Sequence, residues 1–197
     1  MKKVLFLFTA TAMLLLFSLN SSYAVTISFD PVDQDVLSGE QAFVDIVISG
    51  LGDYTPPSLG MFDLDILFDP TVLSFNSAVY GDPVLGDQLD LSGFVSYTNT
   101  IPEYGNVNLF ELSFDSPYDL DTWQAGSFTL ATLSFDTLAL GSSSLDVYIN
   151  SLSDAWASPL YATVQSGNVN VVPEPGTLLL VGSGLAVIGF LRKRKKQ

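Results

Sequence analysis

Apolar and polar residues alternate along most of residues 25–172, with the period of two that half-buried β-strands show. The clearest run is MFDLDILFD, in which Phe62 and Leu64 alternate with Asp63 and Asp65. Three further runs alternate in the same way: AFVDIVISG (42–50), SLDVYINSL (144–152) and GNVNVV (167–172). Gly, Pro, Asn, Asp and Ser separate such runs at roughly 8–12-residue intervals. The pattern therefore predicts one all-β domain, built from two packed sheets.

Two runs change phase partway along, and one segment departs from the strand pattern. The apolar phase changes after Leu109 in NVNLFELSF and after Leu130 in SFTLATLSF. Such strands are either buried on both faces or contain a β-bulge, and we expect in each a bulge or a bend between the two sheets. In SPYDLDTWQAG, Ser116 as N-cap and Pro117 at the first helical position predict a short helix.

The N-terminus has the three parts of a secretory signal peptide. Two lysines precede an apolar stretch over residues 4–17, and Ser22 and Ala24 are small residues placed for cleavage after Ala24. The alternative is an uncleaved N-terminal anchor, but the apolar stretch is short for a membrane span and ends in polar residues. We therefore expect residues 1–24 to be a signal helix that is removed on export.

The C-terminus combines a second apolar segment with most of the positive charge. Residues 177–191 are uncharged, and as a transmembrane helix they would be about 22 Å long, shorter than a hydrocarbon core of about 30 Å. The basic residues that follow are Arg192, Lys193, Arg194, Lys195 and Lys196. By the positive-inside rule they stop translocation and stay in the cytoplasm.

The middle of the chain is strongly acidic and lacks four residue types. Residues 25–172 contain no Lys, Arg, His or Cys, and they hold all of the 21 acidic residues except Glu174. The resulting formal charge of −20 excludes nucleic acid and anionic lipid as partners of this domain. The absence of Cys excludes disulfides. We interpret the composition as an acidic surface suited to salty or cation-rich surroundings.

The same composition excludes several kinds of catalytic and metal-binding site. Without His, Cys or Lys, the domain cannot form a Ser-His-Asp or Cys-His catalytic site, a Schiff base, or a zinc site of His and Cys ligands. The remaining catalytic groups are carboxylates, and the enzyme class that they allow is a glycoside hydrolase with an acid/base pair. Asp63 and Asp65, about 7 Å apart on one strand face, would be that pair. Strand alternation explains that pair equally well. We therefore expect no catalytic residues and a non-enzymatic protein.

Calcium is the metal that oxygen ligands in an exported domain favour. Two acidic clusters are candidate sites: Asp30, Asp33 and Asp35, and Asp82, Asp87 and Asp90. Neither has the ligand spacing of an EF-hand loop, and no other cofactor is expected. Trp123 and Trp156 are candidates for stacking against sugars, although aromatic residues at strand ends also plug sandwich cores.

Two resemblances extend this interpretation. LGMFDLDILFDPTVLSF, followed by NLFELSF and SFTLATLSFDTLALGSSSL, resembles the cohesin-like domains of secreted bacterial proteins and related carbohydrate-binding modules. That resemblance covers residues 25–172 and implies a jelly-roll β-sandwich of about nine strands. Cohesins bind dockerin modules and relatives of the same architecture bind polysaccharide, but no dockerin-contact residue carries over to this sequence.

The tail resembles the PEP-CTERM sorting signal over residues 173–197. Its motif is Pro173, Glu174 and Pro175, followed by the short Gly-rich span and the basic end. The resemblance implies recognition by an exosortase-type membrane enzyme after the secretion machinery has exported the chain. The precursor would be anchored in the inner membrane of a Gram-negative bacterium, and the product delivered to the cell surface or extracellular matrix. The alternative is a plain anchor whose prolines only end the β domain.

Together these features predict an exported, non-enzymatic protein associated with biofilm or exopolysaccharide, in binding or adhesion, with polysaccharide or another surface protein as its ligand. The first alternative is a carbohydrate-binding module for an exopolysaccharide. A carboxylate-based glycoside hydrolase is the less favoured one.

Overall fold

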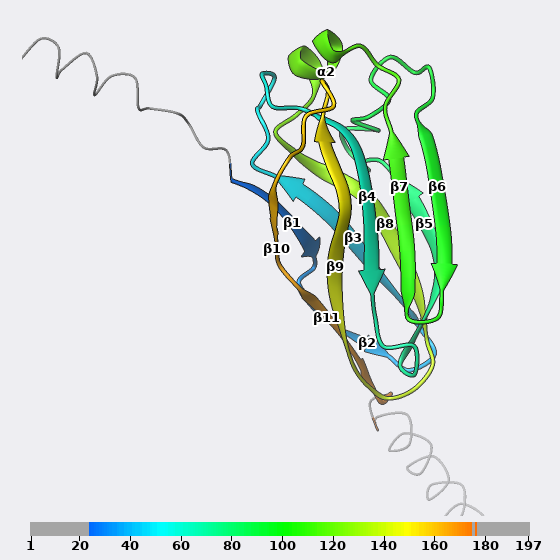
Figure 1. Cartoon of the computed structure of the whole chain (residues 1–197). Coiled ribbons are helices and arrows are strands. Elements are labelled where there is room, and N and C mark those ends of the chain that lie inside the picture. The colour runs from blue at the N-terminus through cyan, green and yellow to red at the C-terminus, as the bar shows by residue number, and fades with distance from the viewer. Residues whose placement is uncertain (1–23, 175, 177–197) are drawn as a thin grey trace, which may run out of the picture.

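The computed structural model describes residues 24–174 and 176 (Figure 1). These residues contain eleven strands, which form two packed sheets, and one helix. The strands are β1 (Val25–Asp30), β2 (Asp33–Leu37), β3 (Gln41–Ser49), β4 (Leu59–Leu67), β5 (Leu73–Tyr80), β6 (Tyr97–Glu103), β7 (Asn106–Leu112), β8 (Ser127–Thr137), β9 (Gly141–Asp154), β10 (Ala162–Val164) and β11 (Gly167–Val172). The helix is α2 (Pro117–Trp123). One sheet has the order β10-β1-β3-β8-β5, and the other has the order β2-β11-β9-β4-β7-β6.

The predicted β-sandwich is confirmed. The inward residues of β4, Phe62, Leu64 and Ile66, are completely buried between the sheets. They belong to one continuous apolar core to which both sheets contribute. The sandwich has more strands than the expected nine because β2 and β10 are short additions that pair in parallel with β11 and β1. Runs of five and three residues are too short to show an alternating pattern in the sequence.

The two phase changes have different causes. In β8 the register against β3 shifts, so that Ala131 pairs with Ile46 and Thr129 pairs with Val47, which leaves Leu130 as the extra residue of a β-bulge. The bulge predicted there is confirmed. The bulge predicted in β7 is wrong, because β7 pairs with β4 and β6 without any shift. Leu109 faces the core, and the apolar residues of the opposite phase lie on the outer surface of the sheet.

The predicted short helix is also confirmed. Ser116 is the N-cap of α2, and its Oγ accepts a hydrogen bond from the Asp119 backbone N at 3.2 Å. Leu120 is the buried residue of the helix and anchors it to the sandwich. Helix α2 and the segments around it (residues 50–58, 81–96, 113–126 and 154–159) form one end of the molecule, which we call the α2 end (Figure 1).

The opposite end carries the exit to the C-terminal segment, and we call it the tail end (Figure 1). Strand β11 finishes there, where the Val172 carbonyl accepts a hydrogen bond from the Ser38 backbone N at 2.9 Å. Pro173 and Glu174 follow directly and are exposed. Residues 1–23, 175 and 177–197 lie outside the described residues, and with them lie most of the signal peptide, Pro175, the predicted membrane span and the basic end. Within residues 24–174 and 176, no helix has the length and apolar character needed to cross a membrane.

Candidate functional site

The outer surface of the six-stranded sheet carries carboxylates and amides among exposed apolar side chains, in contrast to its largely apolar inner surface. Strand register places Tyr148, Asp65, Asn108 and Ile101 in one row across β9, β4, β7 and β6. Asp63 lies in the neighbouring row of β4. We call the outward residues of these four strands the acidic sheet face.

A single amide joins the two carboxylates of this face. Nδ2 of Asn108 donates to Oδ1 of Asp63 at 2.6 Å and to Oδ1 of Asp65 at 2.9 Å. Asn150 Nδ2 also donates to Asp63, at 3.2 Å. Both carboxylates are therefore held by neutral amides on a sheet surface. This arrangement counts against the hydrolase hypothesis, which needs the pair to lie on either side of a bound sugar.

Replacing Asn108 by alanine is expected to lower the free energy of unfolding by about 1–2 kcal/mol. The substitution removes the shared donor and leaves Asp63 and Asp65 to repel each other. Denaturant unfolding at low and high salt measures the effect, which should shrink as salt screens the repulsion. The matched control is Asn99→Ala on the exposed edge strand β6. An equal loss of stability in both variants would contradict the bridging role.

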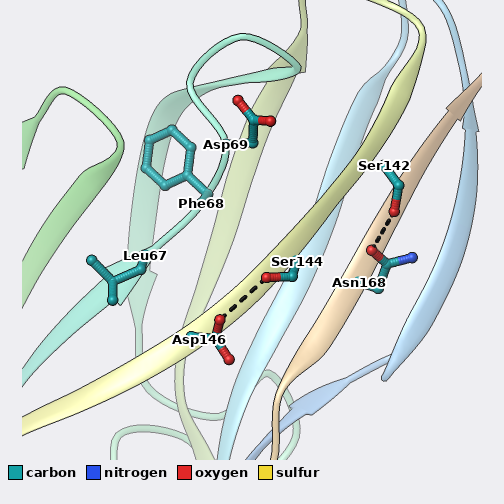
Figure 2. A pocket seen from close by; sticks show the side chains of 7 residues that line it. All are labelled: Leu67, Phe68, Asp69, Ser142, Ser144, Asp146 and Asn168. Carbon is teal, nitrogen blue, oxygen red and sulfur yellow. Dashed lines mark hydrogen bonds between the residues drawn. The ribbon is translucent and has the colours of Figure 1, made fainter.

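An open pocket of about 500 Å³ lies beside this face, toward the tail end (Figure 2). It is lined by Leu67, Phe68, Asp69, Ser142, Ser144, Asp146 and Asn168. Ser142 Oγ donates to Asn168 Oδ1 at 2.6 Å, and Ser144 Oγ donates to Asp146 Oδ2 at 3.2 Å. Thr71 donates to Asp69 from its hydroxyl and its backbone N, and these hydrogen bonds lower the pKa of Asp69. The pocket thus offers hydroxyl, amide and carboxylate oxygens, which suits a ligand rich in hydrogen-bond donors.

The second predicted calcium cluster serves to hold the loop over residues 81–96. Asp82 accepts backbone hydrogen bonds from Val84, Leu85 and Thr129 at 2.8–2.9 Å. Burial opposes ionisation of Asp82, but these amides outweigh it and lower its pKa. Asp87 and Asp90 likewise accept from backbone N atoms within the loop, at 2.9 Å each.

The first cluster lies at the other side of the molecule, where Asp30 ends β1 and Asp33 and Asp35 lie on β2. Asp33 and Asp35 are exposed. In the part of the chain that the structure describes, no three acidic side chains are grouped so that they could hold a metal ion. The calcium sites therefore stay predictions without geometric support.

Both tryptophans lie on the surface at the α2 end and do not plug the core. Trp123 is 63% exposed and Trp156 is 67% exposed. Nε1 of Trp156 donates to Oδ2 of Asp121 at 3.0 Å, and Asp121 also accepts from Ser58 Oγ at 2.7 Å. The indole of Trp156 is thus fixed while its ring stays accessible. Carbohydrate binding at these residues stays a prediction.

The structure adds a buried carboxyl group that the sequence analysis missed. Glu111 on β7 is 1% exposed, and Ser96 Oγ donates to its Oε1 at 2.5 Å. Burial raises the pKa of Glu111 to about 8, the Ser96 hydrogen bond opposes the rise, and Asp87 and Asp90 add to it. The signal was present in the sequence, because Glu111 continues the inward phase of Leu109.

Gln124, immediately after α2, is a second residue that the sequence analysis missed. Its buried Nε2 donates to the carbonyls of Leu59 and Gln88, both at 2.9 Å, and its Oε1 accepts from the Leu59 backbone N at 2.5 Å. Its own backbone carbonyl accepts from Tyr54 N at 3.1 Å. One side chain therefore joins the start of β4 to the 81–96 loop, and no periodicity marks it.

Comparison with known proteins identifies the tail and the fold separately. Residues 171–195 match the PEP-CTERM protein-sorting motif. Among curated proteins, none matches the chain at significant sequence similarity. The tail match includes all three residues of the predicted motif and most of the basic end.

Solved cohesins share the fold of the sandwich. A type I cohesin from Pseudobacteroides cellulosolvens is 16% identical, with a TM-score of 0.60 over 78% of this chain and 95% of that one. The sixth cohesin of scaffoldin B from Acetivibrio cellulolyticus, solved in complex with a dockerin, is 17% identical, with a TM-score of 0.59 over 76% and 99%. A non-cellulosomal cohesin from the archaeon Archaeoglobus fulgidus is 15% identical, with a TM-score of 0.56 over 76% and 91%. The chain therefore combines a cohesin-like β-sandwich with a C-terminal PEP-CTERM protein-sorting motif.

Proposed function

We propose that this protein is an exported, non-enzymatic binding module, sorted by an exosortase-type enzyme to the cell surface or extracellular matrix of a Gram-negative bacterium. The observation that carries the proposal is the sorting motif at residues 171–195. Pro173 and Glu174 emerge directly from the tail end of the sandwich and are exposed. Proline restricts the backbone there to an extended form, which suits recognition by an enzyme at the membrane.

The acidic sheet face is the proposed binding surface for another surface protein. Tyr148 is 63% exposed and lies next to Asp65 in the row, and Ile101 is 47% exposed and lies beyond Asn108 in the same row. Apolar side chains beside charged ones are common in protein interfaces. Because residues 25–172 contain no Lys, Arg or His, a partner with basic side chains supplies the complementary charge. At least four of the structurally similar cohesins were solved with dockerins bound, which favours a protein-binding role.

A role in biofilm or exopolysaccharide is the finer part of the proposal. It is supported by the sorting motif and by the exposed tryptophans of the α2 end. The alternative, a carbohydrate-binding module for an exopolysaccharide, is favoured specifically by the hydrogen bond that fixes Trp156 on Asp121.

Changing Glu174 to alanine, or deleting residues 192–197, is expected to leave an unprocessed form held in the membrane. The first change removes the only charge of the Pro173–Pro175 motif, and the second removes the basic end, most of which belongs to the matched sorting signal. Cell fractionation shows where each variant is located, and intact-mass measurement shows whether its tail has been cleaved.

The matched control for this experiment is Glu103→Ala, which removes an exposed glutamate at the end of β6, outside the motif. It should be processed and delivered like the unchanged protein. Normal mass and location for both tail variants would show that the tail is not read as a sorting signal.

A further inference from the structure

The α2 end gathers several of the large exposed apolar side chains of the domain. Those that matter here are Tyr54, Phe94, Val95, Tyr118, Trp123 and Trp156, and each is at least 57% exposed. They come from four separate segments that α2 and Gln124 bring together. Exposed apolar groups gathered in one region of a soluble domain commonly mark a binding site.

The backbone of the same end is strained at two of these residues, Tyr54 and Val95. Within residues 24–174 and 176, the non-glycine residues with positive φ are Tyr54 (57°), Val95 (71°) and Ala157 (60°), and all three lie at the α2 end. The conformation is especially unfavourable for β-branched Val95, which Asp90 holds by accepting from its backbone N. Such positions are energetically unfavourable and cluster at functional sites such as ligand-binding sites. The loops are thus held in shapes that keep apolar side chains in solvent.

The two indoles are accompanied by hydrogen-bonding groups. Trp123 lines an open pocket of about 400 Å³ together with Leu91, Ser92 and Asp119. On the other side of α2, Asp121 fixes Trp156 through its Nε1 atom. An aromatic face packs against the C–H groups of a sugar ring, while neighbouring carboxylates and hydroxyls bond its hydroxyl groups. This combination of groups is what recognition of a sugar chain requires.

The negative charge of the domain determines which class of polysaccharide it can bind. An anionic polysaccharide would be repelled by the domain and would find no cationic side chain in residues 25–172 to bind its acid groups. An uncharged chain needs only the stacking surfaces and acceptors that are present. The α2 end also lies opposite the tail end, so a sandwich held by its C-terminus presents this surface away from the attachment point (Figure 1).

From these observations we propose that the α2 end is a binding site for an uncharged polysaccharide, with Trp123 and Trp156 as its stacking surfaces. The inference rests on the binding-module function proposed above and adds a ligand class and a site separate from the acidic sheet face. Asp121, which holds Trp156, and Trp123 are two positions apart on α2 and therefore point to different sides of the helix, so we infer that a glycan strand running over α2 contacts both indoles.

Tryptophan fluorescence tests this site directly, because the two tryptophans of the chain both lie in it. The exported protein, purified as cells produce it, is titrated with hydroxyethyl cellulose and galactomannan as uncharged probes and with alginate as an anionic probe. At least one uncharged probe is expected to shift or quench the emission at saturable concentrations, with little dependence on salt. Alginate is expected to have no effect.

Variants separate stacking from general adhesion. Trp123→Ala and Trp156→Ala should each weaken binding at least tenfold in affinity electrophoresis. Trp123→Phe should retain most of the binding, and Trp156→Phe should retain less because it loses the hydrogen bond to Asp121. Tyr104→Ala is the matched control, because Tyr104 is 85% exposed but lies in the β6–β7 turn at the opposite end. Trp123→Ala and Tyr104→Ala should unfold at the same denaturant concentration as the unchanged protein, and Trp156→Ala at a slightly lower one because it loses the exposed hydrogen bond to Asp121.

The proposal is overturned by unchanged emission with both uncharged probes, by undiminished binding in both tryptophan variants, or by an equal loss in Tyr104→Ala. Loss of capture of an envelope protein in the tryptophan variants, without glycan binding, would assign the α2 end to a protein partner instead. Any of these results leaves the sorting function intact, because that is read independently from the mass and location of the Glu174 variant.

Discussion

Replacing Gln124 by methionine is expected to lower the free energy of unfolding by about 3 kcal/mol or more. Methionine keeps the length of the side chain but leaves three buried backbone groups without their partner: the N–H and C=O of Leu59 and the C=O of Gln88. Each buried polar group that loses its hydrogen bond costs about 1–3 kcal/mol. Thermal unfolding should show the loss as a melting temperature lower by roughly 10 °C.

The control for this prediction is Gln41→Met on β3. Gln41 is exposed, and its amide makes one side-chain hydrogen bond, to Asp136 at 2.8 Å. Its replacement should change stability by less than about 1 kcal/mol. If the two variants were equally stable, Gln124 would not be the connection that holds the α2 end to β4.

Replacing Glu111 by glutamine is expected to remove most of the pH dependence of stability between pH 4.5 and about 8. In the folded protein, burial raises the pKa of Glu111 to about 8 from its ordinary value of 4.5, so the folded state keeps a proton that the unfolded chain releases. This contribution to stability is fully present below pH 4.5 and is lost as the pH rises through 8. It corresponds to as much as about 5 kcal/mol across the window.

Glutamine cannot ionise, but it retains an oxygen that accepts from Ser96 and offers an N–H group toward Asp87. The variant should therefore be more stable than the unchanged protein at pH 8–9 and similar to it near pH 4.5. Urea unfolding at a series of pH values measures the slope. The pKa values of Asp69 and Asp82 are lowered, so these groups change the stability only at more acidic pH and do not contribute to its pH dependence between pH 4.5 and 8.

Glu103→Gln serves as the control for the pH experiment, because Glu103 is an exposed glutamate on the edge strand β6. It should leave the slope unchanged. A slope that persisted in Glu111→Gln would place the responsible proton on another group.

The fold was predictable from the sequence where a pattern is local. Alternation in β4 identified Phe62 and Leu64 as core residues, and the phase change after Leu130 identified the bulge in β8. Ser116 and Pro117 identified the start of α2. A phase change by itself does not reveal its cause, which is why the same argument failed for β7. There the second apolar phase lies on the outer surface, and the inward phase ends in a buried glutamate.

The candidate sites depend on contacts between residues far apart in the chain. Asn108 reaches Asp63 across 45 positions, and Gln124 reaches Leu59 across 65. No spacing rule connects such pairs. Likewise, Asp82 and Asp87 could be counted as an acidic cluster, but only their geometry shows that they accept backbone hydrogen bonds and are not arranged around a metal.

The sequence by itself determined the all-β class, the charge of the domain, the absence of cationic and thiol chemistry in it, and the sorting motif at its C-terminal end. These properties follow from composition, local periodicity and short contiguous motifs, so they need no knowledge of the fold. Only the tertiary structure decided which polar side chains form hydrogen bonds between distant segments, which carboxyl group is buried, and which aromatic residues are exposed. Those outcomes depend on which strands and loops become neighbours, and burial and hydrogen bonding between distant segments exist only once the two sheets have packed.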